Sequence, residues 1–405
     1  MTPSWIGGNK FTLLENGEEY YPRLFAAIDA ARQEVLIETF ILYDDKVGRA
    51  LRASLLAAAS RGVRIEVTID GFGSHELPDG FIASLTGAGV RVHVFDPAPR
   101  LFKSVNYFRR LHRKLAVVDG RIAFVGGINY SADHLADYGP EAKQDFAVAA
   151  EGPITAHIHG FMRAAIQQRE SAWHRLLRRM KPRGLPSRPE AGDGEAIFVW
   201  RDNGNCKTDI ERYYRLAIRL AKKRVVIANA YFFPGYAFLR ELRRAARRGV
   251  QVTLILQGNP DMPIVQTAAS MLYHYLLHGG VTIHEYCKRP LHGKVALIDD
   301  EWAFIGSSNL DPFSLALNLE ANLVIRDRQF NQDLYQRLEH MTESCKAVSA
   351  SDLKESRTWR KVRSFFLFHF LKHYPSWAGA LPAHAPKLRS LPAAVDAASQ
   401  VDEPA

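Results

Sequence analysis

One order of helices and strands occurs twice in this chain of 405 residues. In each copy an apolar strand follows a helix, and a second helix then ends at Arg-Gly-Val and leads into another strand. Strand–helix–strand units form mostly parallel sheets covered by helices, so we expect an α/β fold with two similar domains. The expected elements are 24–32, 34–41, 48–60 and 64–69 in the first copy, and 213–222, 224–231, 236–247 and 251–257 in the second.

The spacing of the two copies indicates how the chain divides into domains. Gly62 and Gly249 hold equivalent places about 187 residues apart, which is too far for a short-period solenoid. A stretch rich in proline, glycine and basic residues lies between the copies and predicts a solvated linker. We expect an N-terminal domain at 1–174, the linker at 175–195, a C-terminal domain at 196–348, and an amphipathic helix with a disordered tail at 349–405.

Composition narrows the possible partners and compartments. The net charge of +10 favours an anionic partner, either nucleic acid or an acidic lipid surface. The three cysteines form no CxxC pair or Cys/His cluster, which argues against a disulfide framework or a zinc site and fits a reducing cytoplasm. The sequence shows no signal peptide and no apolar run of 18 or more residues, so we expect no transmembrane helix.

Each copy also contains the pattern His-x-Lys-x4-Asp, followed by a glycine-rich turn and an asparagine. Both patterns lie on aliphatic runs that predict strands, where residues two apart point to one face. Each aspartate falls where a hairpin turn is expected, which favours a structural role for it within the signature. The members are His112, Lys114, Asp119 and Asn129 in the first copy, and His292, Lys294, Asp299, Ser307 and Asn309 in the second.

These residue types suit the cleavage of a phosphodiester, a bond that hydrolyses very slowly without a catalyst. A neutral imidazole nitrogen can attack phosphorus and form a covalent phosphoenzyme. The departing oxygen needs a proton from a group that titrates near neutrality, which a second histidine provides. Two lysines and two asparagines can stabilise the charge on the non-bridging oxygens. This scheme requires no metal, and we expect no cofactor.

Each histidine also needs an acceptor that fixes its tautomer. Glu320 follows His292 in the second copy, and Asp145 occupies the corresponding place after His112 in the first. We expect these two carboxylates to orient the histidines.

The signatures resemble those of the phospholipase D superfamily. Three further runs, at 7–17, 138–146 and 306–320, are similar to bacterial cardiolipin synthases, in particular the B type, and the resemblance covers roughly residues 4–390. It implies two phospholipase D-like domains in a pseudo-twofold arrangement with one shared active site. It also implies phosphatidyl transfer between two phosphatidylglycerol molecules, giving cardiolipin and glycerol.

The resemblance further implies a role for each signature residue. His112 would be the nucleophile, because the N-terminal histidine more often attacks in relatives, and His292 would be the acid and base. Gly127 stands where the second copy has Ser307, so the phosphate contacts of the two halves should differ. The groups expected to bind phosphate are Lys114, Lys294, Asn129, Asn309 and Ser307.

A lipid substrate requires contact with a membrane. A stripe of aromatic and aliphatic residues recurs at helical spacing beside cations near the C-terminus, typical of an interfacial helix, although a helix packed on the domains would give a similar pattern. Residues 101–110 are a second candidate contact. The stripe comprises Trp359, Val362, Phe366, Phe370, Tyr374 and Trp377.

The expected partners are therefore phosphatidylglycerol, phosphatidylethanolamine as another candidate acceptor, and the cytoplasmic face of the cell membrane. A hydrolytic phospholipase D is the alternative function, because it would use the same catalytic residues. A nuclease is less favoured, since nucleic-acid enzymes more often combine basic grooves with stacking aromatics near the site.

Overall fold

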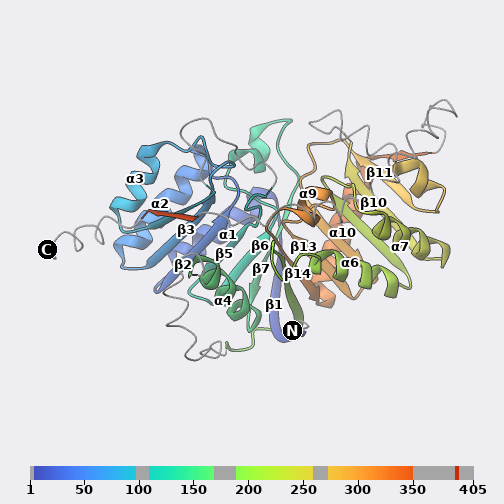
Figure 1. The fold of residues 1–405 in the computed structure, drawn as a ribbon, viewed down its shortest axis with the longest axis horizontal. Coiled ribbons are helices and arrows are strands. Elements are labelled where there is room, and N and C mark those ends of the chain that lie inside the picture. Colours follow the sequence, from blue (N-terminus) through green and yellow to red (C-terminus); the bar gives the residue numbers. More distant parts are fainter. Residues whose placement is uncertain (1–3, 97–108, 168–187, 259–271, 350–387, 392–405) are drawn as a thin grey trace, which may run out of the picture. The chain divides into compact units, whose positions relative to one another are not determined.

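The computed structural model describes residues 4–96, 109–167, 188–258, 272–349 and 388–391 (Figure 1). The chain divides into two compact units, each described here by itself. The first comprises residues 1–132, 147–198 and 385–405, and the second comprises 133–146 and 199–384. The predicted α/β class is confirmed. Most of the predicted linker, the loop at 101–108 and the stripe at 359–377 lie outside the described residues.

The first unit contains a sheet whose three parallel strands continue into antiparallel ones. Parallel strands β2 (Glu34–Thr39), β3 (Arg64–Asp70) and β4 (Arg91–Phe95) are followed along the chain by antiparallel β5 (Leu115–Val118), β6 (Ile122–Gly126) and β7 (Phe146–Glu151). With β1 (Ile6–Glu15), β8 (Gly194–Arg201) and β16 (Leu388–Leu391), the order is β8-β1-β7-β6-β5-β2-β3-β4-β16. The helices are α1 (Asn16–Asp29), α2 (Lys46–Ser60), α3 (Asp79–Gly87) and α4 (Ile154–Gln167).

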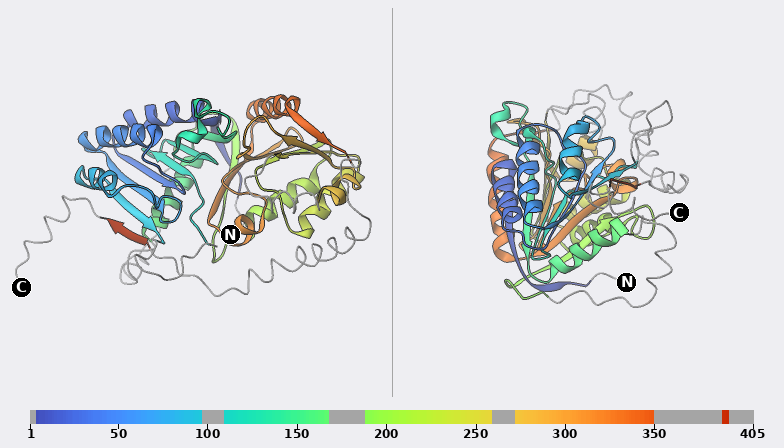
Figure 2. Two further views of the ribbon diagram at one scale, coloured as in Figure 1. Left: turned by 90° about the horizontal axis from the view of Figure 1, so that it is seen from above. Right: turned by 90° about the vertical axis from the view of Figure 1, so that its left-hand side faces the viewer.

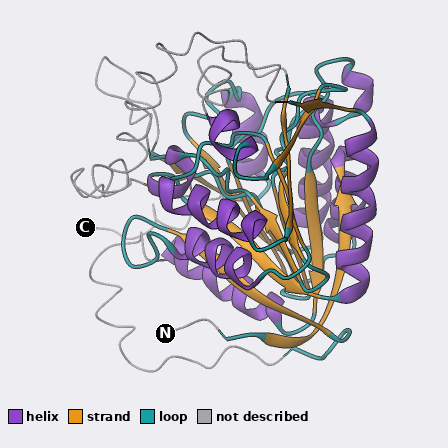
Figure 3. Ribbon diagram, turned by 90° about the vertical axis from the view of Figure 1, so that its right-hand side faces the viewer, coloured by secondary structure: helices purple, strands orange, loops and turns teal. Residues whose placement is uncertain are grey.

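The second unit repeats this plan. Parallel strands β9 (Arg224–Asn229), β10 (Gln251–Gln257) and β11 (Thr282–Tyr286) are followed by antiparallel β12 (Lys294–Ile298), β13 (Trp302–Gly306) and β14 (Glu320–Arg326). At the outer edge β15 (Cys345–Val348) pairs with β11 as β16 pairs with β4. The helices are α6 (Asp209–Leu220), α7 (Tyr236–Arg247), α9 (Pro312–Ala316) and α10 (Arg328–Glu343). In this unit α10 covers one face of the strands and α6 and α7 the other (Figure 2). Coloured by secondary structure, the ribbon shows helices on both sides of the strands (Figure 3).

The repeated Arg-Gly pair has the same structural role in both units. After α2 the guanidinium of Arg61 donates to the carbonyl of Ile28 at 3.0 Å, and after α7 Arg248 donates to the carbonyl of Ile218 at 3.1 Å. In each unit the arginine that follows the second helix therefore bonds to a carbonyl in the last turn of the first helix, α1 or α6. The following glycines, Gly62 and Gly249, have φ of 82° and 89°, a conformation that glycine adopts without strain.

The first predicted helix begins earlier than expected, at Asn16 instead of residue 24. Pro22 lies inside this helix, at its seventh residue, where proline supplies no backbone N–H to the helix. Glu18 and Glu19 lie in the first turn, where negative charge is favourable. Tyr20, Leu24 and Ile28 are buried at intervals of four residues and fix the helix on the core.

Residues 133–146 belong to the second unit although they follow the first signature. The backbone nitrogens of His292 and Gly293 both donate to the carbonyl of Gln144, at 2.8 and 2.9 Å, and Gln144 donates to the carbonyl of Pro290 at 2.8 Å. These bonds hold the segment beside the second signature. In the part of the chain that the structure describes, no helix is both long and apolar enough to cross a bilayer.

Candidate active site

Both signature lysines are buried and bond to the histidine two residues before them. The ammonium of Lys114 donates to the carbonyl of His112 at 2.7 Å, and Lys294 donates to the carbonyl of His292. The sequence predicted that both pairs lie on strands. In the structure both histidines and Lys114 precede the strands, and only Lys294 lies in one, at the first position of β12.

Just before each histidine, one backbone N–H bonds to a side chain. The backbone nitrogen of Leu111 donates to the carboxylate of Asp70 at 2.9 Å, and that of Leu291 donates to the amide oxygen of Gln257 at 2.8 Å. Asp70 and Gln257 are the last residues of β3 and β10. The same contact therefore holds the residue before each signature histidine.

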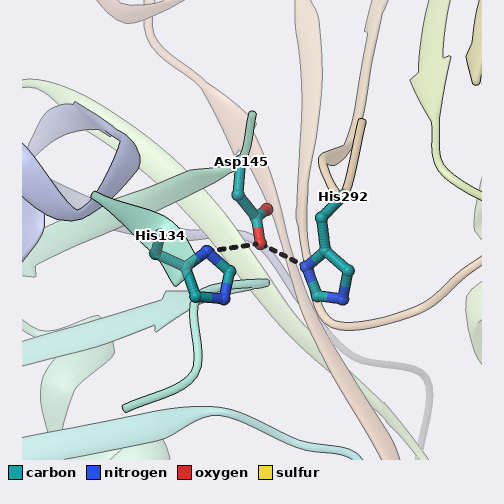
Figure 4. A group of neighbouring side chains, drawn as sticks. All are labelled: His134, Asp145 and His292. Atoms are coloured by element: carbon teal, nitrogen blue, oxygen red, sulfur yellow. Dashed lines mark hydrogen bonds and ion pairs between the residues drawn. The ribbon is translucent and has the colours of Figure 1, made fainter. Parts of the chain in front are cut away.

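His292 forms its principal described side-chain contact with Asp145 (Figure 4). Its Nδ1 lies 2.5 Å from Oδ2 of Asp145, which is fully buried, while His292 keeps 16% of its side-chain surface exposed. The other carboxylate oxygen accepts the backbone N–H of Phe146 at 2.8 Å. Asp145 therefore fixes the proton of His292 on Nδ1 and leaves Nε2 for chemistry.

Asp145 thus contacts a histidine as expected, but it is the histidine of the other copy. Its position after His112 had suggested a partnership within the first copy. The prediction was wrong on this point because residues 133–146 pack with residues 289–293.

A second histidine, His134, lies beside this pair. It is fully buried, its Nδ1 is 3.7 Å from the same Asp145 oxygen, and its ring centre is 5.4 Å from that of His292 in an edge-on arrangement. Burial lowers the pKa of His134 to about 4, so this imidazole is neutral at pH 7. The negative charge of Asp145 is therefore left to interact with His292.

Glu320 and Ser307 form a buried pair next to the second signature. The hydroxyl of Ser307 donates to the Glu320 carboxylate at 2.5 Å and accepts the backbone N–H of Ala321 at 3.1 Å. Ser307, predicted to bind phosphate, thus has its hydroxyl proton directed to Glu320. Burial lowers the pKa of Lys294 to about 8, against the opposing effect of Asp145 and Glu320.

The two asparagines differ in their contacts. Asn129 accepts the backbone N–H of Ile41 through Oδ1 at 3.2 Å. Oδ1 of Asn309 is buried and has no hydrogen-bond partner among the described residues. A buried amide oxygen in this state suits a site that a ligand completes.

Asp119 and Asp299 hold turns. Each accepts three consecutive backbone N–H groups, from residues 32–34 and 222–224 respectively, at 2.7 to 3.2 Å. Both have positive φ, 51° and 53°, which aspartate tolerates in tight turns. Each aspartate follows the end of its strand, β5 or β12, that is opposite to the signature lysine. This position agrees with the structural role that the sequence favoured for both aspartates.

The comparisons with known proteins agree with one another. The family model described as "Cardiolipin synthase, PLD-like domain" matches residues 24–158 and 214–342. Cardiolipin synthase B of Salmonella typhi is 52% identical over 396 residues, covering 97% of this chain and 95% of that protein. This chain belongs to the phospholipase D-like cardiolipin synthase family. Cardiolipin synthase A of Pseudomonas putida is 32% identical over 359 residues, covering 88% of this chain and 73% of that protein.

A solved structure supports the same fold for this family member. Phosphatidylserine synthase of Haemophilus influenzae Rd KW20 superimposes with a TM-score of 0.66 at 14% identity, covering 92% of this chain and 95% of that one. At this identity the likeness shows the fold alone.

The cluster of His134, Asp145 and His292 offers three possible metal ligands within 4.8 Å of one another. The His292–Asp145 separation of 2.5 Å is shorter than the roughly 3.3 Å between two ligands of one tetrahedral zinc ion with bonds of about 2.0 Å. The geometry of this synthase is therefore that of a hydrogen-bonded pair, which does not fit a metal site.

Sequence reasoning missed four residues near the signatures. Asp70 and Gln257 could have been found, because both end the second strand of a repeat. His134 carried no signal, since a lone histidine in a loop has no period or spacing to mark it. Phe40 lies beside the first signature, its ring centre 5.1 Å from that of His112 and 5.3 Å from the ammonium of Lys114.

Proposed function

We propose that this protein is a phosphatidyltransferase that converts two molecules of phosphatidylglycerol into cardiolipin and glycerol. The observation that carries the proposal is the buried Asp145 bonded to His292, because it equips one signature histidine as an acid and base. The duplicated signature supplies the second histidine. The family of the chain, and the names of its curated relatives, support the choice of lipid.

In the first step a ring nitrogen of His112 attacks the phosphorus of the donor lipid. A P–N bond forms and the P–O bond to the headgroup glycerol breaks, while the His292 imidazolium gives its proton to the departing oxygen. The Asp145 carboxylate stabilises that imidazolium before the proton leaves. The products of this step are glycerol and a phosphatidyl group on His112.

In the second step His292 is neutral and takes a proton from a headgroup hydroxyl of the second phosphatidylglycerol. The resulting oxygen attacks phosphorus, a P–O bond forms, and the P–N bond to His112 breaks. Cardiolipin leaves, and both histidines return to their starting states. The non-bridging oxygens would be held throughout by Lys114, Lys294, Asn129 and Asn309.

The proposed setting is the cytoplasmic face of the cell membrane, with the protein bound peripherally. The net charge of +10 supports contact with anionic lipid. Phosphatidylethanolamine is a further candidate acceptor. If water accepted the phosphatidyl group instead of a lipid, the reaction would be that of a phospholipase D.

A product assay tests the proposal. Phosphatidylglycerol in detergent micelles would be incubated with the wild type and with His112→Ala and His292→Ala, and the lipids separated. Cardiolipin from the wild type alone is the expected result. Phosphatidic acid without cardiolipin would replace the proposal with hydrolysis, and no lipid turnover would reject it. Trapping the intermediate should give phosphohistidine at His112, and label at His292 would reverse the two roles.

A further inference from the structure

One helical face of the second unit combines cations with exposed leucines. Every exposed residue of α7 is an arginine, and those of α6 are two arginines and two leucines. The acids of these helices are half-buried or buried, Glu241 being only 2% exposed. We name this surface the α6–α7 face, made of Arg212, Leu216, Arg219, Leu220, Arg240, Arg244 and Arg247.

The seven side chains form two adjacent rows. On α6 and α7 they recur at spacings of three, four and seven residues, so each row lies on one side of its helix. The helices pack against each other through Tyr214 and Phe238, whose ring centres are 6.0 Å apart. Arg248, just after α7, bonds to carbonyls at the end of α6, so both helices end together (Figure 1).

The first unit shows that the fold does not require this composition. Its helices α1 and α2 hold the same places before and after the first strand of the repeat. Their exposed residues include two acids, Glu18 and Asp29, and several alanines beside Arg23, Lys46 and Arg49. The α6–α7 face of the second unit therefore carries more positive charge and larger exposed apolar side chains than the equivalent face of the first unit.

The leucines indicate what kind of partner the cations meet. Leu216 is 39% exposed and Leu220 56%, on a face where solvent alone would favour polar side chains. A single-stranded nucleic acid partner would be better served by aromatic rings that stack on bases. Arginines beside projecting leucines match an anionic bilayer, where cations meet headgroups and apolar side chains enter the acyl boundary.

We propose that the α6–α7 face is the surface through which this protein binds an anionic lipid bilayer. The inference rests on the proposed function, since it supplies the route by which a peripheral enzyme reaches membrane lipids. Each exposed cation near such a surface contributes about fivefold to binding. Loss of three should therefore weaken binding on the order of 100-fold.

The test compares three variants in the full chain. Arg212→Gln/Arg240→Gln/Arg247→Gln removes three charges from the face without touching the buried Glu241 or its partners. Leu216→Ser/Leu220→Ser removes the apolar part. The matched control, Arg23→Gln/Lys46→Gln/Arg49→Gln, removes three charges from α1 and α2. Each is measured by co-sedimentation with vesicles of phosphatidylserine and phosphatidylcholine, with phosphatidylcholine alone, and by thermal unfolding.

The expected result is a loss of about 100-fold in binding to anionic vesicles for the arginine variant, a smaller loss for the leucine variant, and near wild-type binding for the control. Equal losses in the arginine variant and the control would show that net charge alone drives binding and would overturn the proposal. Unchanged binding of the arginine variant would also overturn it. The proposal would also be overturned if the arginine variant lost binding to a DNA oligonucleotide while it still bound anionic vesicles like the wild type.

A micelle assay separates this proposal from the proposed function. Detergent presents the lipid without a bilayer, so the arginine variant should make cardiolipin in micelles at the wild-type rate. A wild type that makes no cardiolipin in micelles would reject the proposed function, while the vesicle comparison would still decide the role of the face.

Discussion

Asp145→Asn tests the central contact of the site, because it removes one charge and keeps the shape of the side chain. Asp145 is fully buried and 2.5 Å from Nδ1 of His292. Its negative charge stabilises the imidazolium that the proposed mechanism requires before the leaving group departs. An asparagine amide can present its NH₂ group to Nδ1, which would place the imidazole proton on the wrong nitrogen.

The size of the effect follows from electrostatics. Two unit charges about 4 Å apart interact by about 4 kcal/mol at an effective dielectric constant of 20. In the second step His292 gains its positive charge as the acceptor oxygen attacks, so a loss of that size in this transition state lowers the rate by about 10³-fold. The neutral His134 beside Asp145 cannot replace the missing charge.

The assay is the initial rate of cardiolipin formation from phosphatidylglycerol micelles at pH 7. Asp137→Asn is the matched control, because it makes the same change at an exposed position of the same segment. We expect the control to keep wild-type activity and Asp145→Asn to lose about 10³-fold in kcat with KM little changed. Activity of Asp145→Asn within about threefold of wild type would refute the assigned role.

Three further predictions follow from the buried groups and turns. Because burial lowers the pKa of Lys294 to about 8, its ammonium loses a proton as the pH rises through that value, and kcat/KM should fall there. In a pH–rate profile, Lys294→Arg should move this fall in kcat/KM to higher pH. His134 has a pKa of about 4 when folded and about 6.5 when unfolded, so stability should fall by about 3 kcal/mol as pH drops from 6.5 to 4. Urea unfolding of His134→Gln should show a smaller fall, and an identical pH dependence would contradict the assignment. The Asp119 carboxylate accepts backbone N–H groups in a turn, so Asp119→Ala should lower the free energy of unfolding by about 2 kcal/mol, measured as a lower Tm. Its kcat with phosphatidylglycerol micelles should fall much less than that of Asp145→Asn.

The fold could be predicted because its signals are local. Strand β2 is buried at all six positions, and the apolar run Val35–Ile37 at its centre marked it in the sequence, as expected for a parallel strand covered on both faces. The Arg-Gly ends of α2 and α7 marked the repeat. The start of α1 was missed: the helix includes Pro22 and begins eight residues before the predicted start at residue 24, at Asn16.

The partner of His292 could not be predicted in the same way. Asp145 is 147 residues away along the chain, and their contact depends on the packing of residues 133–146 with 289–293. No periodicity encodes such a contact. Positional equivalence between copies pointed to the wrong histidine, because it assumes that each copy is complete by itself.

The differences between the copies also bear on the roles of the two histidines. In the first unit Glu38 and Arg113 form a buried ion pair, whereas the register of β9 with β12 places Ala228 and Gly293 at the equivalent positions in the second. A rigid charged pair beside His112 and a small, uncharged pair beside His292 give the two imidazoles different surroundings.

Different surroundings suit different tasks. A nucleophile must be held at one angle to phosphorus, and Arg113, bonded to Glu38 and lying over the Phe161 ring at 4.8 Å, fixes the residue next to His112. An acid and base must change charge twice per turnover, and His292 has a carboxylate bonded directly to it for that purpose. These contacts support the proposed assignment of His112 as the attacking group and His292 as the acid and base.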